Sequence, residues 1–302
     1  MTDWLTGPLT YRVTHRTVYS YSSPVTDAYS VTTLLPRNTA LQTVIERGVE
    51  TDPGADEYEQ RDDVFGNHVV QLGLHQAHDR FEVTGRSLVT VDPGSFADAS
   101  PAWEDAAEAN RLARGADLFE IGSFLALTPS VQAVNSGPYL DTIFAPDFAP
   151  RRPVAEVARA VCSRIFQSFA FDPTATDVST PLDGVVADHR GVCQDFAHLA
   201  IAVFRRRGLA ARYVSGYIET DPPPGEPKSI GADASHAWCS LHVPGFGWLD
   251  LDPTNDQVPT TRHVTVAWGR DYRDVTPVRG VVIGPAADQS LEVSVDVQRV
   301  GG

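Results

Sequence analysis

The sequence predicts an α+β protein in which a β-rich N-terminal region precedes a region of mixed helices and strands. Apolar and polar residues alternate with a period of two from residue 11 to about residue 93. Apolar residues then recur at helical spacing, most clearly over 154–169 and 196–207. The chain has 302 residues, of which 42% are hydrophobic and 21% are charged, so it has a globular composition and can bury a core.

Residues 1–95 are expected to form a β-rich domain. The runs YRVTH at 11–15 and FEVT at 81–84 alternate as strands do. The runs DPG at 52–54 and FGN at 65–67 are typical of turns, because glycine, proline, aspartate and asparagine adopt turn geometries readily. The pattern therefore predicts several strands joined by short turns.

Residues 96–152 are expected to form a helical connector. Apolar positions recur at helical spacing, but prolines interrupt the pattern, and a proline breaks or ends a helix because it lacks a backbone N–H. We therefore expect several short helices. The interrupting prolines are Pro101, Pro129, Pro138, Pro146 and Pro150.

Residues 153–275 are expected to form an α+β core, and residues 276–302 to add C-terminal strands that pack on the core or on the N-terminal domain. The core begins with the two amphipathic helices, which carry apolar stripes. Alternating runs follow these helices. The strands expected from them are 211–218, 236–243, 248–252, 281–283 and 291–297.

Charge and cysteine content limit the classes of partner. The net charge of -15 disfavours nucleic acid and anionic membrane surfaces, which both attract basic proteins. Three cysteines, an odd number, do not form a disulfide framework, which favours a reducing compartment. The first residues lack the pattern of a secretion signal and no apolar run could span a bilayer. These features lead us to expect a cytoplasmic protein.

Cys193 is the candidate nucleophile. The run GVCQDFAH places it where a turn gives way to an apolar helical stripe, and the run RRRG at 205–208 marks the end of that helix. Cys193 is therefore expected at the helix N-terminus, where unpaired N–H groups favour the reactive thiolate. The carboxylate of Asp195, in the same turn, would oppose this slightly.

His236 and Asp252 are the candidate base and the candidate orienter of that base. If the turn between their strands is centred near Pro244, the two residues face each other. Directly opposed side chains have β-carbons about 4.5–5.5 Å apart, close enough for a carboxylate to hold an imidazole. A shift of the turn by one residue on each arm would favour Asp250 instead. Asp250 is thus the competing orienter, and we favour Asp252.

Other cysteines and histidines have simpler interpretations. Cys162 lies within an expected helix, and Cys239 lies in mid-strand on the face opposite His236, so both are expected to pack in the interior. His198 follows Cys193 by little more than one helical turn, and we expect it at the surface or between elements.

Zinc binding is an alternative of another class. Cys193 with His198, and Cys239 with His242, could pass for two pairs of zinc ligands. Strand alternation places Cys239 and His242 on opposite faces, however, whereas a structural zinc needs four converging ligands. This alternative is therefore disfavoured.

Four ordered runs resemble consecutive blocks of the transglutaminase-like superfamily. Two N-terminal runs and one later run also resemble segments of its bacterial members, so the resemblance covers nearly the whole chain except the connector. The core runs are GVCQDFAH at 191–198, ARYVSGY at 211–217, SHAW at 235–238 and WLDLDPTN at 248–255, and the others are YRVTHRTVYSY at 11–21, DVFGN at 63–67 and WGRDYRDV at 268–275.

The resemblance implies a papain-like α+β core preceded by a β-rich, sandwich-like N-terminal domain that shapes the substrate groove. It also implies that Cys193 is the nucleophile, His236 the base and Asp252 its orienter, with no metal or other cofactor. A protein or peptide is the implied substrate. The proline-rich loop at 221–227, one strand before His236, is expected to border the site.

Thiol-dependent acyl transfer on amide or peptide bonds is the leading hypothesis, with a thioester intermediate. The backbone N–H of Cys193 would be the first oxyanion donor. The resemblance favours a peptidase or amidase, and the alternative is transamidation or deamidation of protein glutamine. A non-catalytic binding module, in which the N-terminal domain binds a partner, is the alternative of another class. The intact Cys, His and Asp argue against that module.

Overall fold

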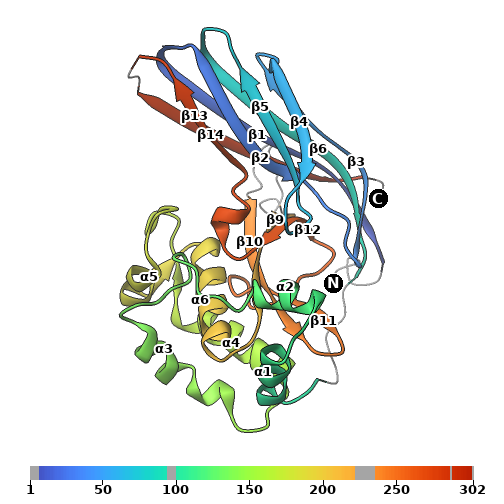
Figure 1. Cartoon of the computed structure of the whole chain (residues 1–302), viewed down its shortest axis with the longest axis vertical. Helices are drawn as coiled ribbons and strands as arrows, with labels where there is room; N and C mark the ends of the chain where they lie inside the picture. The colour runs from blue at the N-terminus through green and yellow to red at the C-terminus, as the bar shows by residue number, and fades with distance from the viewer. Residues whose placement is uncertain (1–6, 94–99, 222–234, 286–287, 301–302) are drawn as a thin grey trace.

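The computed structural model describes residues 7–93, 100–221, 235–285 and 288–300. These residues form a β-sandwich that stands on a second part, which consists of one β-sheet with helices packed around it (Figure 1). In the described part of the chain, no helix has both the length and the apolar character needed to cross a bilayer. The α+β class expected from the sequence is confirmed.

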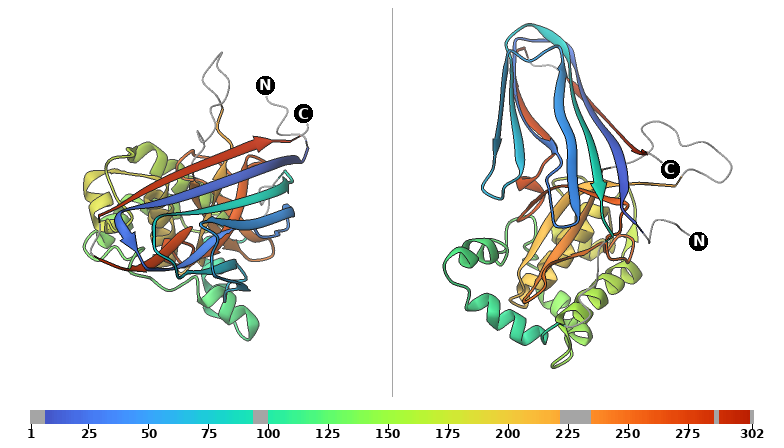
Figure 2. Two further views of the ribbon diagram at one scale, coloured as in Figure 1. Left: turned by 90° about the horizontal axis from the view of Figure 1, so that it is seen from above. Right: turned by 90° about the vertical axis from the view of Figure 1, so that its right-hand side faces the viewer.

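Two four-stranded antiparallel sheets form the sandwich, in the orders β14-β1-β6-β3 and β13-β2-β5-β4. The sheets face each other (Figure 2), and their inner faces bury a cluster that includes Leu72, Leu74, Phe81 and Val83. Alternation in sequence produces this cluster, because successive side chains on a strand point to opposite faces. The strands are β1 (Leu9–Val25), β2 (Asp27–Leu35), β3 (Gln42–Asp52), β4 (Glu57–Asp62), β5 (His68–Leu74), β6 (His78–Val91), β13 (Val278–Ile283) and β14 (Gln289–Arg299).

The last two strands belong to the sandwich, although they follow the core in sequence. β13 pairs with β2, and β14 pairs with β1 along its whole length, from Tyr11 opposite Arg299 to Tyr21 opposite Gln289. The sandwich is therefore built from both ends of the described chain, with the core inserted between them.

The second part contains a four-stranded antiparallel sheet in the order β11-β10-β9-β12. The long helices α4 (Val154–Ser168) and α6 (Cys193–Arg206) contact this sheet. The apolar stripes expected from the sequence are buried in one core cluster with the sheet residues Ala237, Cys239 and Leu241. The strands are β9 (Ala211–Ile218), β10 (Ser235–Val243), β11 (Gly247–Leu251) and β12 (His263–Gly269).

Short elements fill the connector and the turns around α6. The connector contains short helices, with Pro138 and Pro146 in the first turns of α3 and η2, whereas α5 and β12 were not anticipated. The helix α5 is only seven residues long. The run HVTVAWG of β12 does alternate as a strand, and the sequence analysis did not use this signal. The elements are α1 (Trp103–Arg111), α2 (Ala116–Gly122), α3 (Gly137–Ile143), the 3-10 helices η2 (Ala145–Phe148) and η3 (Tyr272–Asp274), α5 (Leu182–Asp188), and the two-residue strands β7 (Ala170–Phe171) and β8 (Arg190–Gly191).

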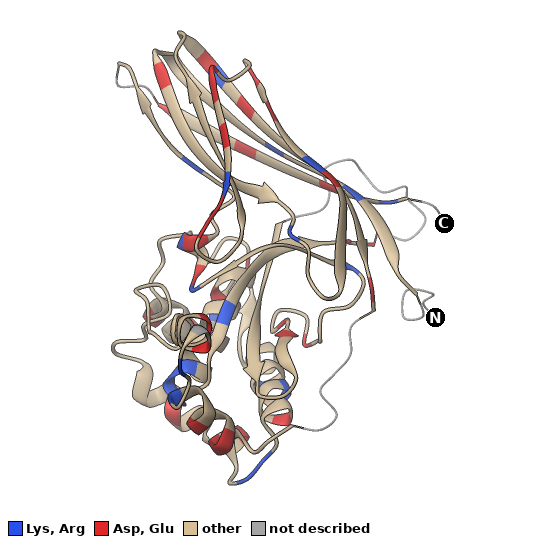
Figure 3. Cartoon of the chain, turned by 45° about the vertical axis from the view of Figure 1, so that its right-hand side comes forward, with Lys and Arg blue, Asp and Glu red and all other residues tan. Residues whose placement is uncertain are grey.

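Charged residues are distributed over both parts of the molecule (Figure 3). Oppositely charged side chains form ion pairs, for example Arg16 with Glu82 at 2.8 Å and Arg270 with Asp274 at 2.9 Å. Pairs of this kind near the surface contribute about 0–1 kcal/mol each, so apolar packing provides most of the stability.

Two amide side chains of the sandwich bond to the backbone of β12. Gln42 Nε2 donates to the carbonyl of Thr265 at 2.7 Å, and Thr265 N–H donates to Gln42 Oε1 at 2.8 Å. Asn67 forms the same reciprocal pair with the N–H and carbonyl of Trp268, at 3.0 and 2.8 Å. Gln42 and Asn67 are both buried. We call these two residues the amide clamp. They bond to backbone groups of β12, an edge strand of the core sheet, which has no neighbour among the described strands on that side.

We expect Gln42→Ala to lower the free energy of unfolding by about 3 kcal/mol, because it leaves a buried N–H and carbonyl of Thr265 without partners. Urea unfolding of the full chain measures this change. Gln60→Ala is the matched control, since Gln60 is exposed on β4 and its truncation should change stability by about 0.5 kcal/mol or less. Equal effects of the two substitutions would show that the amide clamp adds nothing to the free energy of unfolding.

Candidate active site

Cys193 is the first residue of α6, and Asp195 shapes the turn before it. The Asp195 carboxylate accepts hydrogen bonds from the backbone N–H of Val192 at 2.9 Å and from the hydroxyl of Thr176 at 2.6 Å. Gly191 allows this arrangement, because a β-carbon there would lie 2.8 Å from the carboxylate. Burial raises the pKa of Asp195, although both hydrogen bonds oppose this. Asp195 therefore holds the turn before α6 in place, a role that the sequence analysis did not anticipate.

His236 lies between Cys193 and Asp252. Its Nε2 is 2.8 Å from Oδ2 of Asp252, and the neighbouring Cys193 side chain acts together with Asp252 to raise its pKa. Because Nε2 contacts the carboxylate, Nδ1 is the ring nitrogen left for the sulfur. Cys193 is partly exposed, whereas His236 is 8% exposed and Asp252 is completely buried. The structure thus brings together the three side chains singled out in the sequence, and Cys193 is the most exposed of the three.

Asp252 accepts several hydrogen bonds in addition to the one from His236. Its Oδ1 accepts from the backbone N–H groups of Thr254 at 3.0 Å and Asn255 at 3.2 Å. Its Oδ2 accepts from Nδ2 of Asn255 at 2.7 Å and from Nε2 of His263 at 3.1 Å. A buried carboxylate needs this number of donors to remain ionised away from water.

The hydrogen bonds decide the charge states of the pair. Burial alone would raise the pKa of Asp252, but the hydrogen bonds from His236 and His263 lower it well below its usual range. Burial likewise would lower the pKa of His236, but hydrogen bonds to Asp252 and Cys193 raise it above its ordinary value. We therefore expect a carboxylate next to a histidine that keeps its proton at neutral pH.

The strand register between β10 and β11 differs from the expected one. Val243 pairs with Gly247 and Ser240 pairs with Asp250, so the turn is centred on Gly245 and not on Pro244. A three-residue loop with a glycine at positive φ, here +84° at Gly245, accounts for the shift. The expectation that His236 directly faces Asp252 was therefore wrong.

Asp252 still reaches His236, because a diagonal neighbour on the same face is within range of a long side chain. Asp252 follows the last residue of β11 and forms an isolated bridge with Gln257. The competing candidate, Asp250, accepts a hydrogen bond from the hydroxyl of Ser240. Asp252 is therefore the carboxylate that contacts His236 despite the changed register.

The other cysteines and His198 are buried. Cys162 is 3% exposed and Cys239 is 0% exposed, and burial raises the pKa of both thiols well above the ordinary value. His198 accepts a hydrogen bond from the backbone N–H of Tyr272 at 3.1 Å, so it links α6 to η3. A surface position for His198 is therefore wrong, and the inter-element position is correct.

Among the described residues, atoms able to bind a metal gather at His236, Asp252 and His263, within 4.8 Å of one another. The two nitrogen–oxygen distances, 2.8 and 3.1 Å, are those of hydrogen bonds. The zinc pairs considered from sequence do not converge here, because His198 bonds to a backbone N–H and His242 lies 3.3 Å from Oδ1 of Asn110. We therefore describe the cluster as a hydrogen-bonded network.

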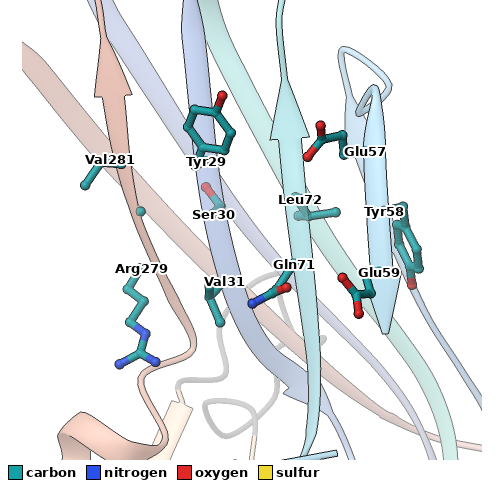
Figure 4. A pocket seen from close by; sticks show the side chains of 11 residues that line it. Tyr29, Ser30, Val31, Glu57, Tyr58, Glu59, Gln71, Leu72, Arg279 and Val281 are labelled. Carbon is teal, nitrogen blue, oxygen red and sulfur yellow. The ribbon is translucent and has the colours of Figure 1, made fainter. Parts of the chain in front are cut away.

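Two cavities differ in their relation to this network. A concavity of about 720 Å³ lies on the outer face of the sheet β13-β2-β5-β4, lined by residues such as Tyr29, Glu57 and Arg279 (Figure 4). A second cavity of about 540 Å³ is lined by His263 and Trp238 of the core and also by Gln42 of the sandwich. The sandwich thus forms part of the wall of the cavity beside His263, and neither cavity is lined by Cys193, His236 or Asp252.

Comparisons with known families agree with this arrangement. The family described as the bacterial transglutaminase-like N-terminal region matches residues 11–90, and the family described as the transglutaminase-like superfamily matches residues 144–253. The second match includes Cys193, His236 and Asp252. The chain belongs to the transglutaminase-like superfamily.

Several relatives of this transglutaminase-like protein are known. An uncharacterized protein of Mycobacterium tuberculosis is 40% identical over 305 residues, covering 97% of this chain and 94% of that protein. A protein-glutamine gamma-glutamyltransferase of Pseudomonas aeruginosa is 30% identical over 109 residues, covering 33% of this chain and 16% of that protein. A crystal structure from Cytophaga hutchinsonii, provisionally described as a cysteine protease, has a TM-score of 0.75 at 19% identity and covers 98% of this chain and 92% of that one. This structure shares the fold of the whole chain.

Sequence reasoning missed two residues of the network. Asn255 lies in the run that suggested Asp252, but an amide three residues after an aspartate gives no pattern of its own. His263 opens an unanticipated strand, and nothing in its local sequence connects it to Asp252. Residues 222–227 of the proline-rich loop expected to border the site lie outside the described residues.

Proposed function

We propose that this protein catalyses thiol-dependent acyl transfer on amide or peptide bonds, with Cys193 as nucleophile, His236 as acid and base, and Asp252 as its orienter. The observation that carries the proposal is a partly exposed cysteine at a helix N-terminus, beside a histidine that a buried carboxylate holds. This is the arrangement that activates a sulfur nucleophile.

The reaction would proceed in two halves. The Cys193 thiolate attacks the carbonyl carbon of the amide, and His236 donates its Nδ1 proton to the departing nitrogen as the carbon–nitrogen bond breaks. A thioester remains. His236, now neutral, takes a proton from water or an amine, which attacks the thioester and releases the sulfur as thiolate. The Asp252 carboxylate holds Nε2 throughout, so that Nδ1 keeps facing the sulfur.

The backbone N–H of Cys193 is the first donor available to the oxyanion of each tetrahedral intermediate. It is the first amide of α6, and the first amides of a helix have no partner within the helix. Donors of this kind stabilise the charge that develops in the transition state.

We propose hydrolysis, as in a peptidase or amidase, as the outcome of the second half-reaction. The observation that favours it is the partial exposure of Cys193, which would allow water to reach a thioester formed there. Transamidation or deamidation of protein glutamine is the second candidate, and it is favoured by the similarity to the Pseudomonas gamma-glutamyltransferase over 109 residues. Mass spectrometry of peptides incubated with the protein and a primary amine separates chain cleavage, loss of ammonia and amine incorporation.

We expect iodoacetamide to alkylate Cys193 at pH 6 at least tenfold faster than Cys162 or Cys239. Cys193 is partly exposed and lies against a protonated histidine, whereas the other two thiols are buried and their pKa is raised. Peptide mass mapping of the full chain after timed alkylation measures all three rates in one sample.

The two buried cysteines serve as internal controls in that experiment. The His236→Gln variant should slow the alkylation of Cys193 at pH 6, because no imidazolium then lies beside the sulfur, and should leave the slow alkylation of Cys162 and Cys239 unchanged. Equal alkylation of all three cysteines in the native protein would contradict the proposed nucleophile.

A further inference from the structure

Asp252 is shared by two histidines, and His263 is not one of the three residues proposed for the reaction. Nε2 of His263 is 3.1 Å from Oδ2 of Asp252, the same oxygen that lies 2.8 Å from Nε2 of His236. Each donor on a carboxylate oxygen stabilises its negative charge and makes it a weaker base. The two histidines therefore compete for the charge of one oxygen.

The tautomer of His263 follows from its second partner. The backbone N–H of Thr260 donates to Nδ1 at 3.2 Å, so Nδ1 carries no proton and Nε2 carries it. His263 is buried, and burial lowers its pKa against the opposing hydrogen bond to Asp252. The ring is therefore a neutral imidazole that donates to Asp252 at physiological pH.

The position of His263 is fixed from two directions. It is the first residue of β12, whose Thr265 and Trp268 are bonded to the amide clamp of the sandwich. Its ring also packs edge-on against the indole of Trp238, with 5.3 Å between ring centroids. The imidazole thus cannot turn away from Asp252 without breaking contacts on both sides.

We propose that His263 is a positioning residue that weakens the hold of Asp252 on the proton of His236, so that His236 can release that proton to the leaving group. This inference rests on the proposed function. A histidine held too firmly as imidazolium is a poor general acid, because the most effective acid gives up its proton near the working pH. Without His263, the Asp252 carboxylate would hold the proton of His236 more strongly.

The other ionisable groups around the pair do not take over this task. Two are buried thiols with raised pKa, one is the sulfur proposed as nucleophile, and two are carboxylates hydrogen-bonded to serine hydroxyls. A carboxylate or a neutral thiol does not donate to Asp252 as an imidazole N–H does. These groups are Cys162 of α4, Cys193 of α6, Cys239 of β10, Asp250 of β11 and Asp256 of the following loop.

The test follows the protonation of His236 by NMR in the full chain, with His236 resonances identified by their loss in His236→Gln. We expect His263→Phe, which fills the space without donating, to move the titration of His236 to higher pH. We expect His263→Gln, which keeps an N–H donor, to leave it near the native value. Peptide turnover by His263→Phe at neutral pH should fall about 10- to 100-fold, the value of one hydrogen bond to a buried charge, with most of the loss in kcat and not in KM.

The outcomes separate this inference from the function on which it rests. A native His236 that titrates at its ordinary pH, together with no preferential alkylation of Cys193, contradicts the proposed function itself. A raised native titration that is unchanged in His263→Phe overturns only the role of His263. If His263→Phe does not fold, the ¹⁵N shifts of native His263 decide: a proton on Nε2 alone supports the inference, and a proton on Nδ1 or on both nitrogens overturns it.

Discussion

Cys193→Ala is expected to reduce amide or peptide turnover by about 10⁴-fold or more while leaving the fold intact. The substitution removes the atom that would form the thioester, and removal of a nucleophile from such a triad costs several orders of magnitude. Cys193 is partly exposed and only packs against the edge of the core cluster, so its truncation leaves little cavity. Turnover of peptide mixtures, followed by mass spectrometry, measures the loss.

Cys162→Ala is the matched control for this substitution. Cys162 belongs to the buried core of α4, so its truncation should lower stability by about 1–2 kcal/mol and keep turnover within about threefold of native. The thermal unfolding of Cys193→Ala should remain near native. Native turnover in Cys193→Ala would show that the reaction occurs at another site.

Asp252→Asn is expected to lower kcat/KM by about 10³- to 10⁴-fold and to move the alkaline limb of the pH profile to lower pH. The hydrogen bond and the charge of Asp252 are among the causes that raise the pKa of His236 above its ordinary value of 6.5. A raised pKa keeps His236 protonated to higher pH, so activity that needs this proton is lost only as pH rises through the raised value. Without the carboxylate, burial dominates and His236 loses its proton at lower pH. The expected loss in rate is the one caused by the same Asp→Asn substitution in a Ser-His-Asp triad.

Asp250→Asn is the matched control, because Asp250 lies two residues earlier and was the competing orienter. Its carboxylate accepts from Ser240, so we expect kcat/KM within about threefold of native and an unchanged alkaline limb. The decisive measurement is kcat/KM of both variants across pH 5 to 10. If Asp250→Asn and not Asp252→Asn moved the limb, the assignment of the orienter would have to be exchanged.

Local pattern was sufficient to predict most elements that hold the candidate site. The stripe of α6 and its basic end fixed the direction of the helix, and thereby the position of Cys193 at its N-terminus. Alternation along β10 separated His236 from Cys239 correctly, since Cys239 packs in the core cluster. Both conclusions depend on the period of a single element, which neighbouring segments do not alter.

Pairing between elements was harder to predict. The register of β10 and β11 depends on the loop between them, in which Gly245 and Gly247 both have positive φ. Because the turn is centred one residue later than expected, every residue pair between the two strands differs from the expected one. His263 contacts Asp252 from the far strand of the sheet, and Gln42 bonds to Thr265 more than two hundred positions away. Such contacts arise from tertiary packing and leave no local periodicity in one sequence.

The pairing of β14 with β1 has a consequence during synthesis. Cys193, His236 and Asp252 leave the ribosome before β14 exists, and until then β1 lacks the neighbour that pairs with it from Tyr11 to Tyr21. The sheet that carries β3, the strand of Gln42, is thus incomplete while the thiol is already present on the nascent chain. Docking of β14 completes that sheet, so the strand that carries Gln42 gains its full sheet only after the core has been translated.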